Sequence, residues 1–150
     1  MILLSKRALL GVAAVVDVAI HARPVPVAAK ALAVRHGLPP RHLETLLQAL
    51  VRANILKGVR GPKGGYELAR ERRRITVGEI VRVAIASDED GAQELQTISR
   101  LVLEIVAPVV SDASRELISV LEQTTVEDLC RQAEAAGVFG PSSGLVDFTI

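Results

Sequence analysis

Cysteine, histidine and aromatic residues are scarce in this chain. Its 150 residues include one cysteine, three histidines, one tyrosine, two phenylalanines and no tryptophan. Because Cys130 is alone, a disulfide framework or a cysteine-rich zinc site within one chain is excluded. The shortage of aromatic residues disfavours a large β-sandwich, whereas the abundance of Ala, Val and Leu favours helices packed through aliphatic faces.

Long apolar runs are also missing. The first twenty residues are largely apolar, but Lys6 and Arg7 follow the opening residues and Asp17 interrupts the rest. No stretch reaches the roughly 18 apolar residues that a membrane-spanning helix needs. A signal peptide is disfavoured because no polar region and cleavage pattern follow cleanly. We therefore expect a soluble, cytoplasmic protein that does not contact a membrane.

Motifs for catalysis are lacking as well. The chain has no nucleophile motif, phosphate-binding loop or histidine-rich metal site. The glycines of the segment GPKGGY resemble a phosphate-binding loop, but they precede a predicted strand and lack the Lys-Ser/Thr ending. We interpret His21, His36 and His42 as surface or helix-capping residues. The protein is therefore not expected to be an enzyme or to bind a metal or another cofactor.

Charge is abundant but unevenly distributed. Residues 1–86 contain fifteen Lys and Arg against five Asp and Glu, and residues 87–150 contain three against twelve, although the net charge of the chain is only +1. A basic half joined to an acidic half indicates a module that binds a polyanion and a module that avoids it. An accidentally uneven surface is the alternative.

Three helices are predicted at the start of the chain, over residues 5–22, 27–36 and 40–53. Ser5 is expected to cap the first, Gly37 to end the second and Pro40 to open the third. The third helix has one apolar face, made of Leu43, Leu46, Leu47, Leu50 and Val51. Its remaining positions, Arg41, His42, Glu44, Thr45, Gln48 and Arg52, are expected to lie outside this face, with Glu44 the least certain of them.

A β-hairpin is predicted next, with strands over residues 55–59 and 66–69. Its tip, RGPKGG, combines cations with three glycines that free the backbone for close approach to another molecule. A basic tract over residues 70–74 follows. Thr76 and Glu79 then form a capping-box pattern that predicts a fourth helix to about Ala86.

The second half of the chain predicts an elongated helical region. Residues 87–93 form an acidic linker, and residues 94–137 contain a long helix that Pro108 should kink or divide. Thr125 and Asp128 form another capping-box pattern, which opens a last helix before Gly137. A long helix on a small domain is most simply buried by pairing with a second copy. Residues 138–150 are expected to be a flexible tail.

The predicted fold class is mainly α with a small β-hairpin: a winged helix-turn-helix domain over residues 1–86 plus a long dimerisation helix. In this fold, one helix presents side chains to base edges in the major groove, and a basic hairpin reaches the adjacent minor groove. Each element alone has a plainer interpretation, as a core helix or a surface turn. Lys6, Lys30, Lys57 and residues 72–74 are either phosphate contacts or solvated charges.

Three segments carry a resemblance to a known family. They are LSKRALLGVAAVVDVA, GLPPRHLETLLQALVRA and LVRANILKGVRGPKGGYELARERRRITVGEIVRVA. The chain resembles the Rrf family of bacterial winged helix-turn-helix transcription regulators, strongly over residues 1–86 and by pattern over residues 94–137. The resemblance implies a homodimer that binds double-stranded DNA at a roughly palindromic operator, as a repressor.

The resemblance also implies the residues that contact DNA. Those of the third helix, Arg41, His42, Glu44 and Thr45, would face bases or phosphates. Arg60 would enter the minor groove, with the rest of the hairpin tip, Gly61, Pro62, Lys63 and Gly64, beside it. Ser5 and Lys6 would lie near the DNA backbone.

The chain departs from the family in one respect. Relatives that bind an iron–sulfur cluster carry three cysteines between the hairpin domain and the long helix, whereas the corresponding segment here, SDEDGAQELQT, has no Cys or His. Thiolates are the ligands that such a cluster needs, so we expect no cluster. Cys130 is either a small buried hydrophobic residue or a redox switch. A protein or a small molecule remains a candidate effector. A hairpin that binds a protein instead of DNA is the alternative function.

Overall fold

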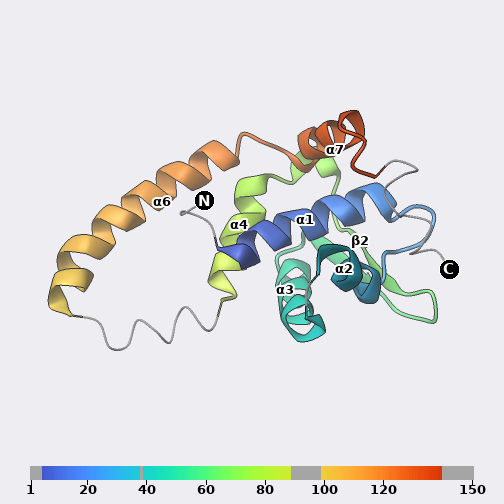
Figure 1. The fold of residues 1–150 in the computed structure, drawn as a ribbon, viewed down its shortest axis with the longest axis horizontal. Coiled ribbons are helices and arrows are strands. Elements are labelled where there is room, and N and C mark those ends of the chain that lie inside the picture. Colours follow the sequence, from blue (N-terminus) through green and yellow to red (C-terminus); the bar gives the residue numbers. More distant parts are fainter. Residues whose placement is uncertain (1–4, 38, 89–98, 140–150) are drawn as a thin grey trace.

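The structure is a computed structural model that describes residues 5–37, 39–88 and 99–139 (Figure 1). Residues 89–93 of the predicted linker and residues 140–150 of the predicted tail therefore lie outside the described residues. The described residues contain six α-helices, two β-strands, one short 3-10 turn and one π-helical segment. The mainly helical fold with one hairpin confirms the predicted fold class.

The first three helices begin and end close to their predicted bounds. Helix α1 spans Lys6–His21, and the Ser5 hydroxyl oxygen accepts a hydrogen bond of 3.2 Å from the Ala8 N–H. Helix α2 spans Ala29–His36 and ends at Gly37, whose φ of 61° is a left-handed conformation that glycine adopts without strain. Helix α3 spans Pro40–Arg52, with the proline in its first turn.

Helix α2 starts two residues later than predicted, because Val27 pairs with the hairpin. The Val27 N–H donates to the Tyr66 carbonyl oxygen over 2.9 Å, and the Tyr66 N–H donates back over 2.8 Å. This pairing keeps Val27 extended. A side chain at Gly65 would collide with the Val27 carbonyl group, so the close approach requires glycine there.

The hairpin consists of strands β1 (Leu56–Val59) and β2 (Gly65–Leu68), paired antiparallel with Leu56 opposite Leu68 and Val59 opposite Gly65. A 3-10 turn, η1 (Arg72–Arg74), leads to helix α4 (Val77–Ala86). Thr76 and Glu79 form the predicted capping box.

The long helix contains an irregular segment before Pro108. Its described part comprises the π-helical segment η3 (Val102–Val106) and helix α6 (Ala107–Leu121). Pro108 has no N–H to donate to Glu104, and its ring would clash with that carbonyl group in a regular α-helix. The wider π-helical turn places the irregularity immediately before the proline. Pro108 thus distorts the helix without dividing it.

The last helix, α7 (Val126–Ala135), begins at the predicted capping box of Thr125 and Asp128. The sequence groups it with the dimerisation helices, but the structure packs it against α1 and η1, where Val126 and Cys130 join the buried core. The Val126 N–H donates to the Ile75 carbonyl oxygen over 2.8 Å. Phe139, which the sequence assigns to a flexible tail, contacts the ring of His21 edge-on at 4.7 Å.

The core gathers the aliphatic faces of α1, α3, α4 and α7 around the inner side of the hairpin. In α3 the buried residues are Leu43, Leu46, Leu47 and Leu50. Val51, predicted to belong to this face, is instead 36% exposed. In Figure 1, α3 and the hairpin lie on the lower side of the molecule and α7 lies on the upper side. The carboxyl-terminal end of α6 packs against the start of α4, and the rest of α6 extends away from the domain.

Candidate nucleic-acid interface

Helix α3 presents a polar outer face because its four leucines hold the opposite face in the core. Arg41, His42, Glu44 and Thr45 are all exposed. The Thr45 hydroxyl donates to the Arg41 carbonyl oxygen one turn earlier, over 3.2 Å. Every α3 residue that the sequence assigned to DNA therefore faces solvent, where a nucleic acid can reach it.

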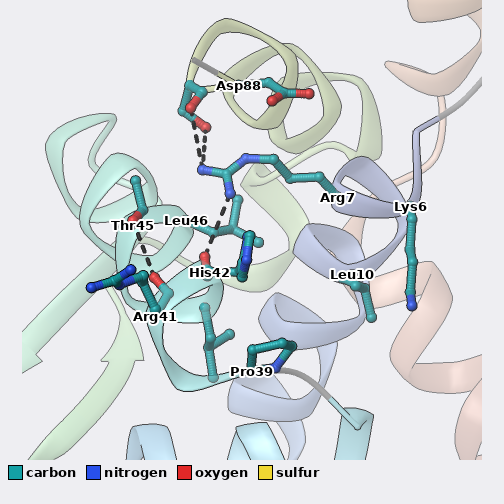
Figure 2. A pocket seen from close by; sticks show the side chains of 11 residues that line it. Lys6, Arg7, Leu10, Pro39, Arg41, His42, Thr45, Leu46 and Asp88 are labelled. Atoms are coloured by element: carbon teal, nitrogen blue, oxygen red, sulfur yellow. Dashed lines mark hydrogen bonds between the residues drawn. The ribbon is translucent and has the colours of Figure 1, made fainter. Parts of the chain in front are cut away.

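The amino-terminal turns of α1 and α3 lie on the two sides of one surface cavity of about 530 Å³ (Figure 2). Four of the predicted side chains, those of Lys6, Arg41, His42 and Thr45, line it. Two helix amino termini direct unpaired N–H groups and a partial positive charge toward this region, which favours a bound anion. Ser5 caps α1 beside the cavity, whereas Glu44 does not line it.

The hairpin tip forms a second exposed basic region. Arg60, Gly61, Pro62 and Lys63 are exposed. Gly61 has φ of 118°, and the Gly64 N–H donates to its carbonyl oxygen over 2.9 Å, which closes the tip as a tight turn. A side chain at Gly64 would collide with the Val59 carbonyl oxygen, so this turn requires glycine. None of these residues lines the cavity between α1 and α3.

Several other cations are paired with carboxylates within the protein. Lys57 lies 3.3 Å from Glu67, Arg70 lies 2.6 Å from Glu79, and Arg72 pairs with Glu127. Among the described contacts, no ion pair involves Lys6, Arg41, Arg60 or Lys63. The four cations of the predicted interface are thus among those without a carboxylate partner in the described contacts, which strengthens its positive potential.

Arg73 belongs to the paired group. It lies 2.6 Å from Glu71, and its hydrogen bond, together with its charge, lowers the pKa of that carboxyl. Within the tract over residues 70–74, Arg70 and Arg72 therefore join the hairpin region to α4 and α7, whereas Arg73 and Arg74 pair locally with Glu71.

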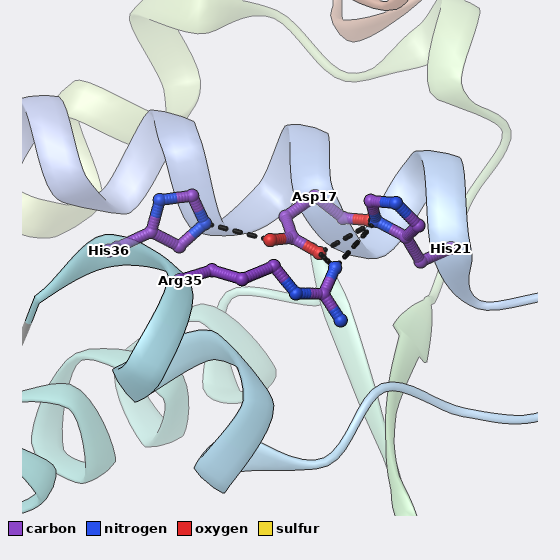
Figure 3. Close-up of polar contacts among 4 residues, drawn as sticks. All are labelled: Asp17, His21, Arg35 and His36. Atoms are coloured by element: carbon purple, nitrogen blue, oxygen red, sulfur yellow. Dashed lines mark hydrogen bonds and ion pairs between the residues drawn. The ribbon is translucent and has the colours of Figure 1, made fainter. Parts of the chain in front are cut away.

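A buried carboxylate that the sequence prediction missed anchors α2 to α1 (Figure 3). Asp17 is fully buried, and its oxygens lie 2.7 Å from Arg35 Nη1, 2.8 Å from His36 Nε2 and 2.9 Å from His21 Nδ1. A buried charge is tolerated only when it is paired and hydrogen-bonded. Arg35 and His36 form the last turn of α2, so the cluster sets the direction from which the chain enters the turn before α3.

This cluster corrects the interpretation of His21 and His36 as surface or capping residues, since both side chains are only 17% exposed. One signal was visible in the sequence: Asp17 interrupts an apolar helical run, and His21 follows four residues later on the same face. The contacts to α2 depend on how the two helices cross and have no local signal.

A second residue that the prediction missed is Arg7, next to Lys6. Its side chain is half-buried and points across the cavity toward the start of α3 and the end of α4 (Figure 2). Nη2 donates to the Ser87 hydroxyl over 3.0 Å and to the Ser87 carbonyl oxygen over 3.3 Å. Nη1 donates to the His42 carbonyl oxygen over 3.5 Å.

Cys130 lies in the core on α7, with no exposed surface. Burial raises the pKa of its thiol, and the neighbouring Arg72 guanidinium offsets part of this effect. Within the described residues, no three His, Cys, Asp and Glu side chains are placed to hold a metal ion.

The long helix leaves its apolar side chains uncovered. Neither η3 nor α6 has a buried residue. The exposed large apolar residues are Leu101, Leu103, Ile105, Val106, Val109, Val110 and Val120, with exposed fractions from 44% to 68%. Among the described helices, none is long and apolar enough to cross a membrane.

Three helices followed by a hairpin, with an outward-facing polar α3 and a basic tip, define a winged helix-turn-helix domain. Comparison with known proteins assigns it further. The model of the Rrf2 family, described as an iron-dependent transcriptional regulator, matches residues 4–132. The chain therefore belongs to the Rrf2 family, which confirms the resemblance seen in the sequence.

Individual relatives agree with this assignment. Protein rrf2 of Nitratidesulfovibrio vulgaris is 27% identical over 132 residues, which cover 87% of this chain and 88% of the relative. IscR of Xenorhabdus nematophila, an HTH-type transcriptional regulator, is 30% identical over 131 residues, which cover 85% and 78%. These relatives are transcriptional regulators and not enzymes.

Solved structures match the whole described fold. The structure of T. potens IscR has a TM-score of 0.66 at 34% identity and covers 89% of both chains. That of CymR, the global cysteine regulator of B. subtilis, has a TM-score of 0.63 at 30% identity and covers 88% of this chain and 98% of CymR. The protein is thus a winged-helix, DNA-binding transcription regulator of the Rrf2 type.

Proposed function

We propose that this regulator binds a specific, roughly palindromic operator as a homodimer and represses transcription, without a cysteine-ligated iron–sulfur cluster. The observation that carries the proposal is the segregation of cations. Lys57, Arg70 and Arg72 pair with carboxylates at the base of the hairpin and at its junctions with α4 and α7. Lys6, Arg41, Arg60 and Lys63, in contrast, lie exposed on α1, α3 and the tip with no ion pair among the described contacts. Because bacterial DNA lies in the cytoplasm, we place the protein there.

In this proposal α3 enters the major groove. Arg41, at the second position of the helix, is suited to guanine, and Thr45, one turn later, can contact several bases. His42 and Glu44 complete the exposed face. Ser5 and Lys6 then lie against the DNA backbone at the amino terminus of α1, where the helix end favours phosphate.

The hairpin tip reaches the adjacent minor groove. Arg60 inserts there because a narrow groove concentrates negative potential, and Lys63 contacts the phosphates beside it. Gly61, Pro62 and Gly64 keep the tip compact and free of bulky side chains. Lys57, which pairs with Glu67 in the strand, contributes less than Arg60.

The uncovered side of η3 and α6 supports a homodimer. An exposed apolar stripe of this length on a small domain is best buried against an identical helix, and a twofold dimer reads two related half-sites. Such a dimer, seated over a promoter, excludes RNA polymerase by steric overlap, and therefore we propose repression.

The donor set does not fit a family-type iron–sulfur cluster. The chain has one cysteine, it is buried in α7 beside Arg72, and a cluster needs several thiolates. A protein or small-molecule effector acting on the dimer is the signal that we propose instead.

Selection of bound duplexes from a random pool tests the operator directly. We expect enrichment of one sequence with two related half-sites. Arg60→Ala should then lower the affinity for the selected duplex more than Lys57→Ala, its paired control in the hairpin. Arg41→Ala should relax the base preference by about 1–3 kcal/mol at one position of each half-site. A pool that stays unenriched would instead favour a hairpin that binds a protein.

A further inference from the structure

Arg7 joins three elements that the DNA interface depends on. It belongs to the first turns of α1, and its guanidinium reaches both the first turn of α3 and the carboxyl end of α4. Figure 2 shows its side chain running from α1 across the cavity toward Asp88, with His42 below it. In the described part of the chain, no other side chain connects these three elements through hydrogen bonds.

The chemistry at the α4 end favours this cation. The Ser87 carbonyl oxygen is one of the last acceptors of α4, and the partial negative charge of a helix carboxyl end attracts a guanidinium. The Ser87 hydroxyl, which donates to the Ala84 carbonyl oxygen over 3.1 Å, is fixed in place to accept from Arg7. Arg7 is therefore held most firmly at α4, and from there it reaches the His42 carbonyl oxygen.

Its partial burial separates Arg7 from a phosphate ligand. Lys6 is exposed, whereas Arg7 is half-buried and its Nε has no access to solvent and no hydrogen-bond partner among the described residues. If the Arg7 guanidinium turned outward to reach a phosphate, it would lose its hydrogen bonds to the Ser87 hydroxyl and carbonyl oxygen. The geometry thus assigns Arg7 to positioning and Lys6 to the DNA backbone.

We propose that Arg7 is a positioning residue that fixes the first turn of α3 against the end of α4, and so sets how accurately α3 reads bases. The inference rests on the proposed DNA-binding function. It adds a regulatory consequence: a movement of Ser87 and Asp88, at the start of the connection to the long helix, reaches α3 through Arg7.

The test compares Arg7→Met with Lys6→Met in the full-length chain. The probes are the duplex selected by the wild-type protein and a shuffled duplex of equal length and composition. Arg7→Met should lower the affinity for the selected duplex about tenfold, the effect of one lost charged hydrogen-bond network, and change the affinity for the shuffled duplex much less. Lys6→Met should weaken both duplexes alike and reduce the salt slope by about one.

Ser87→Ala provides a second variant, which removes only the hydroxyl that accepts from Arg7 and lies at the end of α4, away from Arg41 and Thr45. It should lower the affinity for the selected duplex a fewfold, and the double variant should be no weaker than Arg7→Met alone, because both changes remove one connection. Arg7→Lys should restore only part of the affinity, since a single ammonium cannot replace the planar fork.

Three results would overturn the proposal: an unchanged affinity in Arg7→Met, a salt slope that falls by about one in that variant, or additive effects of the two substitutions. These results can be interpreted if Arg7→Met is folded, which is shown by a thermal unfolding transition as cooperative as that of the wild type. If Arg7→Met does not fold, the affinities and salt slopes of Ser87→Ala and Arg7→Lys test the proposal by the same criteria. A wild-type protein that binds no duplex would contradict the proposed function itself and is recognised before any variant is compared.

Discussion

At the scale of single residues, burying the Asp17 carboxylate opposes folding, because a charge loses its hydration in the core. It has no exposed surface, and its charge is balanced by Arg35 with hydrogen-bonding contacts to two histidines. Coulombic attraction in a buried site offsets desolvation only while all partners remain. The geometry of the helix-turn-helix therefore depends on a carboxylate that never contacts DNA.

Replacing this carboxylate should destabilise the protein severely. Asp17→Asn removes the buried carboxylate charge that faces Arg35, His21 and His36, and we expect the free energy of unfolding to fall by about 3–5 kcal/mol in urea denaturation. Glu44→Gln, the matched change of an exposed carboxylate on α3, should alter it by less than about 0.5 kcal/mol. Equal stabilities of the two variants would contradict this account of the cluster.

Cys130 should behave as a core residue. Burial raises the pKa of its thiol, so the reactive thiolate is scarcer at neutral pH than for an exposed cysteine and forms only at higher pH. We expect a thiol reagent to label the native protein far more slowly than the urea-unfolded protein. Peroxide should leave the operator affinity equal in wild type and Cys130→Ser. Rapid native labelling, or a peroxide response that Cys130→Ser abolishes, would instead establish the redox switch.

The sequence predicts the exposed residues of α3 better than the residues that support α3 from behind. Arg41, His42 and Thr45 follow from the spacing of the leucines on one helix, which is a local pattern. Asp17 and Arg7 act on partners up to 80 residues away, so their roles depend on helix crossings that no local pattern encodes.

At the scale of secondary-structure elements, helix ends were predictable wherever a side chain caps them. Ser5, Thr76 and Thr125 each accept a hydrogen bond from the helix that they precede, and each helix begins where predicted. The start of α2 was wrong by two residues because its boundary is set by pairing between Val27 and Tyr66, which lie far apart in the sequence.

The crossing of α4 and α6 is another non-local feature, and Gly78 permits it. A Cβ at this position would lie 2.8 Å from the Glu122 nitrogen and from the Ile118 carbonyl oxygen, which are backbone atoms that cannot turn aside. Overpacking costs about 1–3 kcal/mol, whereas alanine gains about 1 kcal/mol of helix propensity over glycine. Gly78→Ala should therefore lower the free energy of unfolding.

Gly11 offers a matched control on α1. A Cβ there would meet Leu46, Ile80 and Ala84 at 3.6 Å, which is ordinary van der Waals contact. Gly11→Ala should raise the free energy of unfolding by up to about 1 kcal/mol, so the two substitutions should have opposite signs in denaturation experiments. Stabilisation by Gly78→Ala would show that α4 and α6 are less closely packed than described.

At the scale of the whole molecule, the chain separates a basic side, which we propose faces DNA, from an uncovered apolar helix. The charge asymmetry of the sequence predicted two modules, yet α7 returns from the acidic half to complete the core of the basic half. Composition reports the charge of a segment but not the surface against which it packs. For that reason the packing of α7 against α1 could not be predicted from composition.

The proposed homodimer should depend on the exposed face of the long helix. Ile105→Asp places a charge among side chains that would pair across the twofold axis, so sedimentation should show a monomer at concentrations where the wild type is a dimer. Val138→Asp, an exposed apolar residue beyond α7, should leave the dimer intact. A wild-type monomer at micromolar concentrations, or equal effects of both substitutions, would contradict dimerisation through this helix.

The measurement that tests the central claim most directly is the affinity of the full-length chain for duplex DNA as a function of salt concentration. A dimer that uses Lys6, Arg41, Arg60 and Lys63 of both subunits should lose about ten-thousandfold in affinity between about 50 and 200 mM salt. The selected duplex should remain tighter than its shuffled control throughout. Absence of duplex binding at low salt, or an affinity that salt does not change, would contradict the assignment of this face to DNA.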